Sequence, residues 1–275
     1  MEDTHEAELR AYYERGEERD RLAAGHGVLE FIRTTEIVLR HLPPAPARVA
    51  DVGGGPGRYA LWLAEFGYEV EHRDLMPLHV RQVEDDAAAR SVRLRTAVGD
   101  ARELDLSDAS VDAVLLLGPL YHLRRRADRV RALAEARRVV RPGSPVFAAA
   151  ISRWAPRLDG QLRERLYEKF PQMRELTPEV ERTGVLPTLH PGSFSGFCHR
   201  PAQLRAEVRD AGLAVVDLVS VEGPASLLGD LAERMDDPAA RAVVLDAARA
   251  VERVPELLGI GPHLLATGVR SGPFS

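Results

Sequence analysis

Short apolar segments alternate along this chain with longer segments whose apolar residues recur at helical spacing. The short segments predict strands at 48–52, 68–73, 92–98, 111–117, 146–151, 213–221 and 263–269. The longer segments predict helices at 58–66, from Pro77 onward, and at 128–140, 201–212, 224–235 and 238–253. This alternation predicts an α/β fold with a doubly wound, largely parallel sheet, whose ligand lies outside the carboxyl ends of the strands.

The first strand runs directly into a glycine-rich turn. Residues 51–57 read Asp-Val-Gly-Gly-Gly-Pro-Gly, and Tyr59, Trp62 and Phe66 then fall at helical spacing. A strand, a glycine turn and a helix start together bring backbone amides close to a ligand. The alternative is a tight turn whose glycines serve packing alone.

Later strands also end in residues of the kind that bind nucleotides. Asp74 follows the second strand and can accept both hydroxyls of a ribose, and Asp100 follows the third and can accept from an adenine amine. Either acid alone could serve only a turn or a helix cap. A dinucleotide fold requires G-x-G-x-x-G. Gly53 and Gly55 fit that pattern, but Arg58 occupies the third position and the glycine comes one residue early.

These motifs resemble those of the class I S-adenosylmethionine-dependent methyltransferases, and within them the small-molecule, ubiquinone-methyltransferase-like group. The resemblance rests on 51–57, on Asp74, on Gly99-Asp100-Ala101, on 112–122 and on 138–143. It covers roughly residues 45–152, and 200–270 by strand pattern only. It implies a Rossmann-like, seven-stranded sheet whose last strand is antiparallel, and S-adenosyl-L-methionine as the cofactor, with its methionine end near 53–55.

Four parts of the chain follow from this resemblance. We predict an N-terminal helical lid at 1–42, a cofactor-binding core at 43–153, an inserted substrate lid at 154–200, and the remainder of the core at 201–275. The 154–200 stretch breaks the strand–helix alternation and is rich in proline. A connection of this length inside an α/β domain is usually functional.

The cofactor is predicted to meet residues at the strand ends and in the first helix. Asp51 can hold its cationic groups, although it could instead only order the turn, and its carboxylate suits the turn amides, Arg58 or Arg33. The predicted cofactor-binding residues are Tyr13, Asp51, Gly53, Gly54, Gly55, Asp74, Leu75, Asp100, Ala101 and Leu117.

Methyl transfer from a sulfonium is an in-line displacement, so most of the rate gain comes from alignment of nucleophile and methyl group. His122 and Tyr121 follow the fourth strand, beside the expected methyl group, and are predicted to be catalytic. His122 is the candidate general base, because its unperturbed pKa is near neutral. It could instead shape the pocket without moving a proton.

Aromatic and histidine residues outside the core are candidates for the acceptor wall. They are Tyr12, Trp154, His190, Phe194, Phe197 and His199. Each could instead serve core packing, and Tyr12 and Tyr13 could form an ordinary helix face or close over the cofactor. No metal is predicted: no oxygen-ligand cluster is identifiable, and His190, Cys198 and His199 lack a recognised zinc spacing.

Charge and composition narrow the partners. The 275 residues carry a net charge of −5, so no basic field favours nucleic acid or an anionic membrane. There is one cysteine, and no apolar run approaches the roughly 20 residues of a spanning helix. We expect a cytoplasmic protein; the oligomeric state stays open.

The predicted function is transfer of a methyl group from S-adenosylmethionine to an O, N or C atom of a small organic molecule. The fold could instead bind the same cofactor without transferring its methyl, as an isomerisation or cyclisation catalyst or as a cofactor-responsive binding protein. A nicotinamide-dependent dehydrogenase is the third alternative, which Arg58 in place of the third glycine disfavours.

Overall fold

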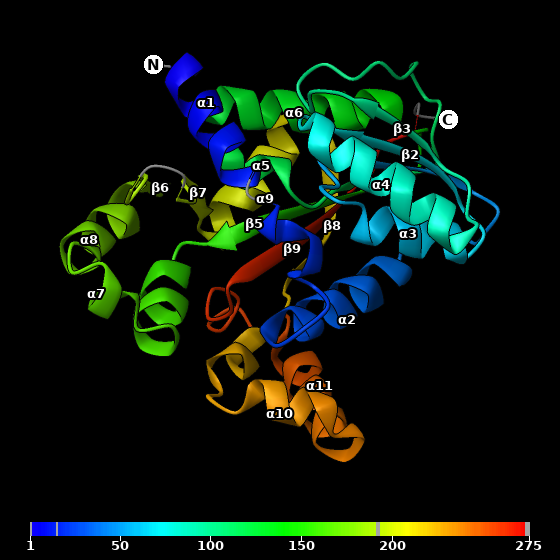
Figure 1. Ribbon diagram of the computed structural model, residues 1–275. Helices are drawn as coiled ribbons and strands as arrows, with labels where there is room; N and C mark the ends of the chain where they lie inside the picture. Colours follow the sequence, from blue (N-terminus) through cyan, green and yellow to red (C-terminus); the bar gives the residue numbers. More distant parts are fainter. Residues whose placement is uncertain (1, 15, 191–192, 273–275) are drawn as a thin grey trace.

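The computed structural model describes residues 2–14, 16–190 and 193–272, and in these ranges one twisted sheet runs through the protein (Figure 1). Its strands are β1 (Arg48–Val52), β2 (Glu69–Asp74), β3 (Arg95–Val98), β4 (Ala113–Leu116), β5 (Pro145–Ser152), β6 (Val185–Leu186), β7 (Gly196–His199), β8 (Leu213–Ser220) and β9 (His263–Arg270). All seven predicted strands are present, and the third and fourth are shorter than their apolar patterns indicated.

The strand order confirms the doubly wound topology. Strands β3, β2, β1, β4 and β5 lie side by side and parallel. Strand β9 then pairs with β5 in the antiparallel direction and is flanked by β8. The last strand is therefore antiparallel, as the family resemblance implied. Because β9 runs backwards, its first residues lie at the edge of the sheet where the parallel strands end.

The sheet has nine strands rather than the seven expected. The two additional strands, β6 and β7, come from the 154–200 insertion. Strand β9 occupies one edge of β5 from Pro145 to Ile151, so β4 and β7 must share the other edge. Strand β4 pairs with β5 up to Ala148, and β7 pairs with Ile151 and Ser152 beyond it. The insertion thus extends the sheet just past the end of β4.

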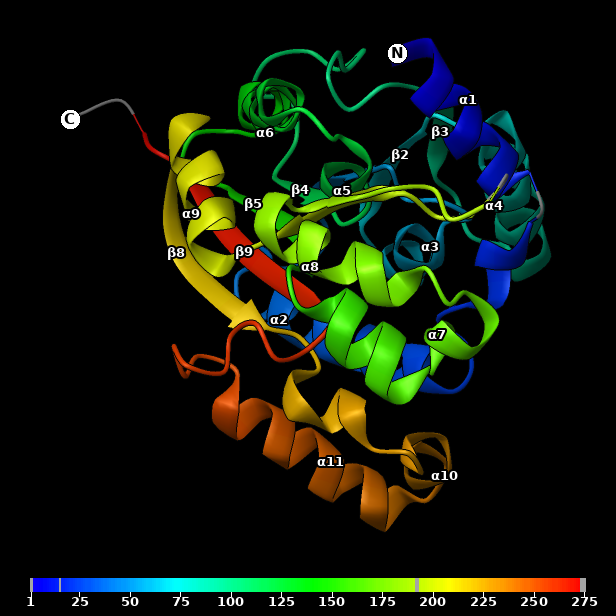
Figure 2. The same ribbon diagram turned by 90° about the vertical axis from the view of Figure 1, so that its left-hand side faces the viewer.

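Helices cover both faces of the sheet (Figure 2). The helices of the described residues are α1 (Glu2–Tyr13), η1 (Glu17–Asp20), α2 (His26–Leu39), α3 (Arg58–Glu65), α4 (Pro77–Arg90), α5 (Pro119–His122), α6 (Arg126–Val139), the π-helix η2 (Pro156–Arg163), α7 (Leu166–Lys169), α8 (Met173–Thr183), α9 (Pro201–Asp210), η3 (Gly223–Leu227), α10 (Leu231–Asp236) and α11 (Pro238–Val251).

Alternation along the strands sends successive side chains to opposite faces. In β1, Ala50 and Val52 pack in the core under α6 and α9, whereas Val49 packs in the core under α2 and α3. Both faces are buried, which explains the nearly continuous apolar run at 111–117. The prediction of helices on either side of the sheet is confirmed.

A third apolar cluster lies away from the sheet. Leu29 of α2 packs with Leu231 and Met235 of α10 and with Val244 of α11. The helices of 223–251 thus cover the outer side of α2 rather than the sheet itself (Figure 1). No helix in the described part of the chain is long and apolar enough to cross a membrane.

One local difference bears on the site. The residues that follow the fourth strand do not form an irregular loop, because Pro119–His122 form a single helical turn, α5. Proline at the first helical position has its backbone angle preset for a helix and lacks only an amide that would be unpaired there. This turn fixes Tyr121 and His122 at the carboxyl end of β4.

Candidate active site

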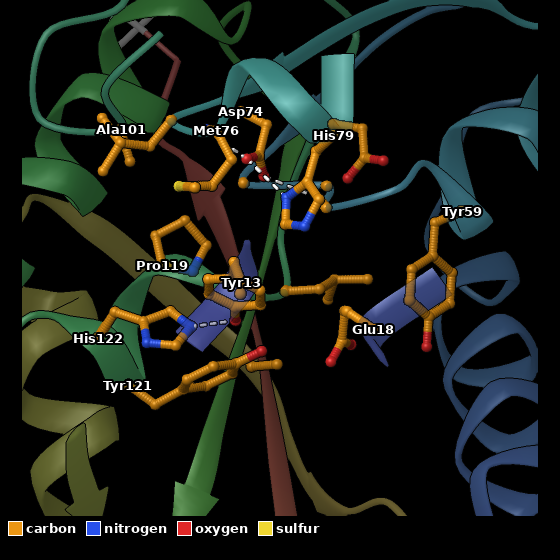
Figure 3. Close-up of a pocket in the computed structure, with 18 of the residues that line it drawn as sticks. Tyr13, Glu18, Tyr59, Asp74, Met76, His79, Ala101, Pro119, Tyr121 and His122 are labelled. Atoms are coloured by element: carbon orange, nitrogen blue, oxygen red, sulfur yellow. Dashed lines mark hydrogen bonds and ion pairs between the residues drawn. The ribbon is translucent and has the colours of Figure 1, made fainter. Parts of the chain in front are cut away.

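A cavity of about 610 Å³ opens at the carboxyl ends of β1, β2 and β4 (Figure 3). This volume lies within the range of small-molecule and cofactor sites. Ala101 and Met76 line one side of it, and Tyr59 lies on the opposite side. Tyr13 reaches into the space from α1, which crosses above the sheet edge.

The glycine turn after β1 is packed on one side and open on the other. Gly53 has a φ of +64°, and a Cβ there would come within 2.4 Å of the Pro119 ring. Gly55 has a φ of +56°, but a Cβ there would meet no heavy atom within 4 Å. Since Gly55 also lines the cavity, its open side is the surface on which a ligand can rest.

Asp51 places a buried carboxylate at this turn. Its exposure is 0%, and neither carboxylate oxygen has a hydrogen-bond partner in the described residues. The amide of Ala60 faces it without reaching hydrogen-bond geometry. Burial, and then the nearby charge of Asp74, raise the pKa of Asp51 to about 7. An unpartnered acid of this kind is costly unless a cationic ligand supplies the missing bonds.

Asp74 is held rigidly at the end of β2. Its carboxylate accepts from the amide of Gly55 at 2.8 Å, from the amide of Met76 at 2.8 Å, and from His79 Nδ1 at 2.9 Å. Burial opposes ionisation, but these hydrogen bonds, led by that of His79, lower the pKa of Asp74. An ionised carboxylate has about four acceptor positions, so one remains for a hydroxyl group of a ligand.

Asp100 and Ala101 lie at the adenine side predicted from the sequence. Both line the cavity. The Asp100 carboxylate accepts from the backbone and the guanidinium of Arg102, which outweigh burial and lower its pKa. Asp100 is thus ionised and fixed, as an acceptor for an exocyclic amine must be.

The aromatic groups after β4 meet the N-terminal helix. Tyr13 Oη lies 2.6 Å from His122 Nε2, and the rings of Tyr121 and His122 lie 4.6 Å apart. Burial is the largest cause that raises the pKa of both tyrosines well above the ordinary value. Each therefore stays a neutral phenol that can donate a hydrogen bond.

All residues predicted to bind the cofactor or to act in catalysis line this one cavity. They are Tyr13, Asp51, Gly53, Gly54, Gly55, Asp74, Leu75, Asp100, Ala101, Leu117, Tyr121 and His122. Of the two arginines considered for the methionine carboxylate, Arg58 lines the cavity, and its Nε has no partner in the described residues. Arg33 is fully buried and paired with Glu36 and Glu252 instead.

The residues predicted for the acceptor wall are more dispersed, and none of them lines the cavity. Phe194 stands behind His122, with ring centroids 5.5 Å apart, and Tyr12 packs edge-on against Phe194. Tyr12 and Phe194 therefore pack against the two residues, Tyr13 and His122, that line the cavity here. Their prediction as substrate-binding residues is untested.

The other four predicted wall residues lie elsewhere. Trp154 is 40% exposed, and the His190 ring stacks on Phe170. Phe197 and His199 are buried beside an ion pair: Arg129 lies over the Phe197 ring, and Glu207 accepts from Arg129 and bonds His199. The site predictions for these four residues are untested.

Sequence reasoning missed several residues of the site. His79 orients Asp74, and its buried Nε2 has no partner in the described chain. His72 Nε2 lies 3.0 Å from the Gly55 carbonyl and supports the turn from below. His263 lines the cavity from the start of β9. The signal for His79 was its position one turn after Asp74, and for His263 the reversed direction of the last strand.

Comparison with known proteins agrees with this arrangement. Residues 50–148, which contain the glycine turn, Asp74, Asp100 and His122, match the family model described as "Methyltransferase domain". Residues 50–148 are therefore similar to known methyltransferase domains, in agreement with the resemblance of their motifs.

Curated relatives that match part of the chain include ubiquinone and menaquinone enzymes. A ubiquinone/menaquinone biosynthesis C-methyltransferase of Acidiphilium cryptum is 37% identical over 133 residues, 47% of this chain and 51% of its own length. A demethylmenaquinone methyltransferase of Deinococcus radiodurans is 36% identical over 104 residues, 37% of this chain and 42% of its own length. The chain thus spans about half the length of the curated relatives it matches.

Solved structures show the same fold over a larger part of the chain. An S-adenosylmethionine-dependent methyltransferase of Methanosarcina mazei superposes with a TM-score of 0.57 at 19% identity, over 86% of this chain and 97% of that one. The likeness extends beyond residues 50–148 to most of the sheet and its covering helices.

Proposed function

We propose that the protein transfers a methyl group from S-adenosyl-L-methionine to an O, N or C atom of a small organic acceptor. The observation that carries this proposal is the unpartnered, fully buried carboxylate of Asp51, which lies against Gly54 in the glycine turn that lines the cavity. An ammonium group of the cofactor would satisfy Asp51, which no protein group in the described residues does. The cofactor supplies a sulfonium methyl as the electrophile.

The residues of the cavity would divide the cofactor between them. Asp51 would hold its amino group, and Arg58 its carboxylate, because the two side chains line the cavity and lack full sets of partners. Asp74 would accept a ribose hydroxyl, and Asp100 with Ala101 would meet the adenine. Leu75, Leu117 and the backbone of Gly53 and Gly54 would complete the apolar and polar contacts.

The acceptor would lie beside Tyr121 and His122. Alignment of the nucleophile with the methyl group supplies most of the acceleration, an effect that can reach about 7–11 kcal/mol. Where the nucleophile carries a proton, His122 Nε2 would take it, which requires the Tyr13 hydroxyl to release this nitrogen. A general base adds roughly 10²–10⁴-fold.

The segments outside the matched domain would enclose the acceptor. We propose residues 1–42 as an N-terminal lid, supported by the position of Tyr13, and 154–200 as a second lid, supported by Phe194 behind His122. The core would comprise 43–153 and 201–275. The net charge of −5 and the single, buried cysteine support a cytoplasmic protein that does not bind nucleic acid.

Two measurements test this function. Calorimetry should show saturable binding of S-adenosylmethionine and of its demethylated product, and mass spectrometry of incubations with small-molecule libraries should show a product heavier by one methylene. Absence of binding of either compound at high micromolar concentration would refute the cofactor assignment. Binding without any methylated product or demethylated cofactor would instead favour a catalyst or binding protein that uses the cofactor without transfer.

A further inference from the structure

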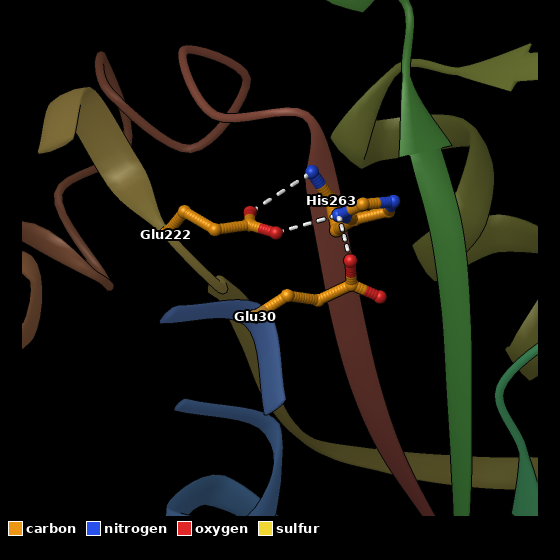
Figure 4. A group of neighbouring side chains, drawn as sticks. All are labelled: Glu30, Glu222 and His263. Carbon is orange, nitrogen blue, oxygen red and sulfur yellow. Dashed lines mark hydrogen bonds and ion pairs between the residues drawn. The ribbon is translucent and has the colours of Figure 1, made fainter. Parts of the chain in front are cut away.

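Three titratable residues meet at the sheet edge without a role in cofactor binding: Glu30, Glu222 and His263 (Figure 4). Glu30 comes from α2, Glu222 follows β8, and His263 begins β9. Their ligand-type atoms all lie within 4.8 Å of one another. The three residues, here called the acid–histidine cluster, are brought together only by the antiparallel direction of β9.

The position of the cluster separates it from the cofactor's methionine end. Strand β9 is three strands away from β1, across β4 and β5. Neighbouring strands lie about 4.8 Å apart, so His263 is displaced by roughly 14 Å along the sheet from the glycine turn. Yet His263 and Glu30 line the same cavity as the turn. This part of the cavity is therefore space for the acceptor.

Hydrogen bonds fix the orientation of the imidazole. His263 Nδ1 lies 2.6 Å from Glu222 Oε1 and 3.9 Å from Glu30 Oε2, and the amide of His263 donates to Glu222 Oε2 at 3.2 Å. Figure 4 shows both carboxylates at one ring nitrogen, with the other nitrogen directed away from them. In the described residues, Nε2 of His263 has no hydrogen-bond partner, and the side chain is 21% exposed.

The charges around the ring favour an imidazolium. Arg21 holds Glu30 through two contacts of 2.5 and 3.1 Å. Burial alone would lower the pKa of His263, but the charges of Glu30 and Glu222 outweigh burial and the repulsion of Arg21 and raise this pKa to about 9. The carboxylates of Glu30 and Glu222 then balance the charges of Arg21 and a protonated His263, and Glu18, which also pairs with Arg21, adds one further negative charge.

The existing ion pairs of Glu30 and His263 disfavour a metal ion at this position. A divalent cation would have to displace the proton from His263 and compete with Arg21 for Glu30. Buried ionic groups are stable when each has an opposite partner, and here each already has one. The acid–histidine cluster therefore favours a proton on His263 over a bound metal ion.

A second, smaller cavity of about 340 Å³ meets the first at this cluster. Arg21, Glu30 and His263 line both cavities, and Asp159 and Arg163 of the π-helix η2 line the second. The first cavity, which His263 lines, also has Tyr59, Val221 and Ala149 in its wall, and the Val221 amide donates to the His263 carbonyl at 3.0 Å. A cationic donor in a cavity with such carbon-rich walls is suited to an apolar or aromatic molecule with one anionic group.

We propose that His263, as an imidazolium, binds the acceptor: its Nε2–H holds an anionic oxygen, a carboxylate or enolate, of an otherwise apolar methyl acceptor. This inference rests on the proposed function, because it concerns the methyl acceptor, but its test does not require methyl transfer. Glu222 and Glu30 are positioning residues that keep the ring charged and turned toward the cavity.

Benzoate and its neutral isostere benzamide are suitable probes. With the protein saturated by the demethylated cofactor, ligand-observed NMR at pH 7 should show benzoate binding at least about tenfold more tightly than benzamide, since a hydrogen bond to a charged group is worth about one factor of ten or more. His263→Gln should remove this preference. The preference should also fade as the pH rises through about 9, because the imidazolium then loses its proton.

Three variants make the result decisive. Glu222→Gln removes one carboxylate and should shift the loss of preference to lower pH without abolishing it at pH 6. His41→Gln removes a histidine that lies outside both cavities and should change nothing. Thermal melts and calorimetry with the demethylated cofactor check that each variant is folded and still loads the cofactor.

Several outcomes would overturn the inference. They are equal affinity for the two probes, no binding of benzoate at tens of millimolar, or a preference that persists in His263→Gln. Saturable Mn²⁺ or Zn²⁺ binding that His263→Gln and Glu222→Gln abolish would assign a metal site in its place. Failure of cofactor binding alone would count against the proposed function, because the probe preference can be measured without cofactor.

Discussion

The hydroxyl of Tyr13 lies 2.6 Å from Nε2 of His122, a contact between residues 109 positions apart in the sequence. It joins the N-terminal helix to the turn after β4, directly across the cavity (Figure 3). The nitrogen proposed to take the acceptor's proton is thus the one that contacts the proposed N-terminal lid. In the proposed function, closure of this lid and readiness of the base are linked through one hydrogen bond.

Tyr13→Phe should loosen the lid while leaving the apolar part of the ring in place. A hydrogen bond of this kind is worth about 1 kcal/mol net, so we expect the Kd for the demethylated cofactor to rise roughly fivefold. Limited proteolysis within α1 should become faster. Calorimetry and a digestion time course measure both effects.

His122→Ala should separate binding from chemistry. We expect turnover to fall roughly 10²-fold or more while cofactor affinity stays within a few-fold of the wild-type value. Wild-type turnover in this variant would reduce His122 to a residue of the cavity wall. His41→Ala, which removes a histidine outside the cavity, is the matched control.

Asp51→Asn should improve stability and impair binding. The folded-state pKa of about 7 lies above the ordinary value of 3.8, so the folded protein prefers the protonated acid. Stability of the cofactor-free protein should therefore fall as the pH rises from about 4 through 7, and this loss should be absent in Asp51→Asn. At pH 8 the variant should be more stable by roughly 2–4 kcal/mol.

The same variant should bind the cofactor at least about tenfold more weakly, because the carboxylate that pairs with the amino group is gone. Chemical denaturation at pH 5 and 8, with and without cofactor, tests both effects together. If Asp51→Asn destabilised the protein at pH 8, the carboxylate would have a structural partner, contrary to its unpartnered state in the described structure.

Most residues of the proposed cofactor site could be predicted from the sequence, because the carboxyl ends of parallel strands meet at one edge of the sheet. Asp74, Asp100 and His122 each follow a strand in the sequence, so the topology alone brings them together. His263 obeys the opposite rule. It is the first residue of its strand, and only the reversed direction of β9 carries it to the same edge.

The residues around the proposed acceptor were harder to predict from the sequence, for a different reason. Strands β6 and β7 are two and four residues long, too short for a recognisable pattern of alternation. Phe197 and His199 stood out as aromatic and titratable residues in an inserted segment, yet pairing of β7 with β5 buries them in the sheet. Which side chains of an insertion face a cavity depends on contacts far away in the chain.

Asp74→Ala should weaken the cofactor strongly for two reasons. It removes an acceptor for the ribose, and it releases the amide of Gly55 and the ring of His79 that shape the cavity. We expect the Kd to rise by about two orders of magnitude. Asp112→Ala is the matched control, because Asp112 precedes β4 at the opposite edge and pairs with Arg141. It should reduce stability and leave the Kd unchanged; similar losses of affinity in both variants would mean that Asp74 acts through stability alone.

Gly55→Ala and Gly143→Ala form the sharpest pair. Both glycines have positive φ, +56° and +83°, and a Cβ at either would meet no heavy atom within 4 Å. Each alanine should therefore cost about 1 kcal/mol of backbone strain and no steric clash. Only Gly55 lines the cavity, so only its Cβ would occupy space meant for a ligand.

The two variants should lose similar stability in denaturation experiments, while cofactor affinity falls tenfold or more in Gly55→Ala alone, roughly 1.4 kcal/mol of binding free energy. This difference would separate the effect of filling the space above the turn on cofactor affinity from the effect of backbone strain within the turn. Unchanged affinity in Gly55→Ala would mean that the cofactor does not rest on the glycine turn. Equal loss in both variants would point to strain transmitted through the fold, and the turn would then be a structural element rather than a binding surface.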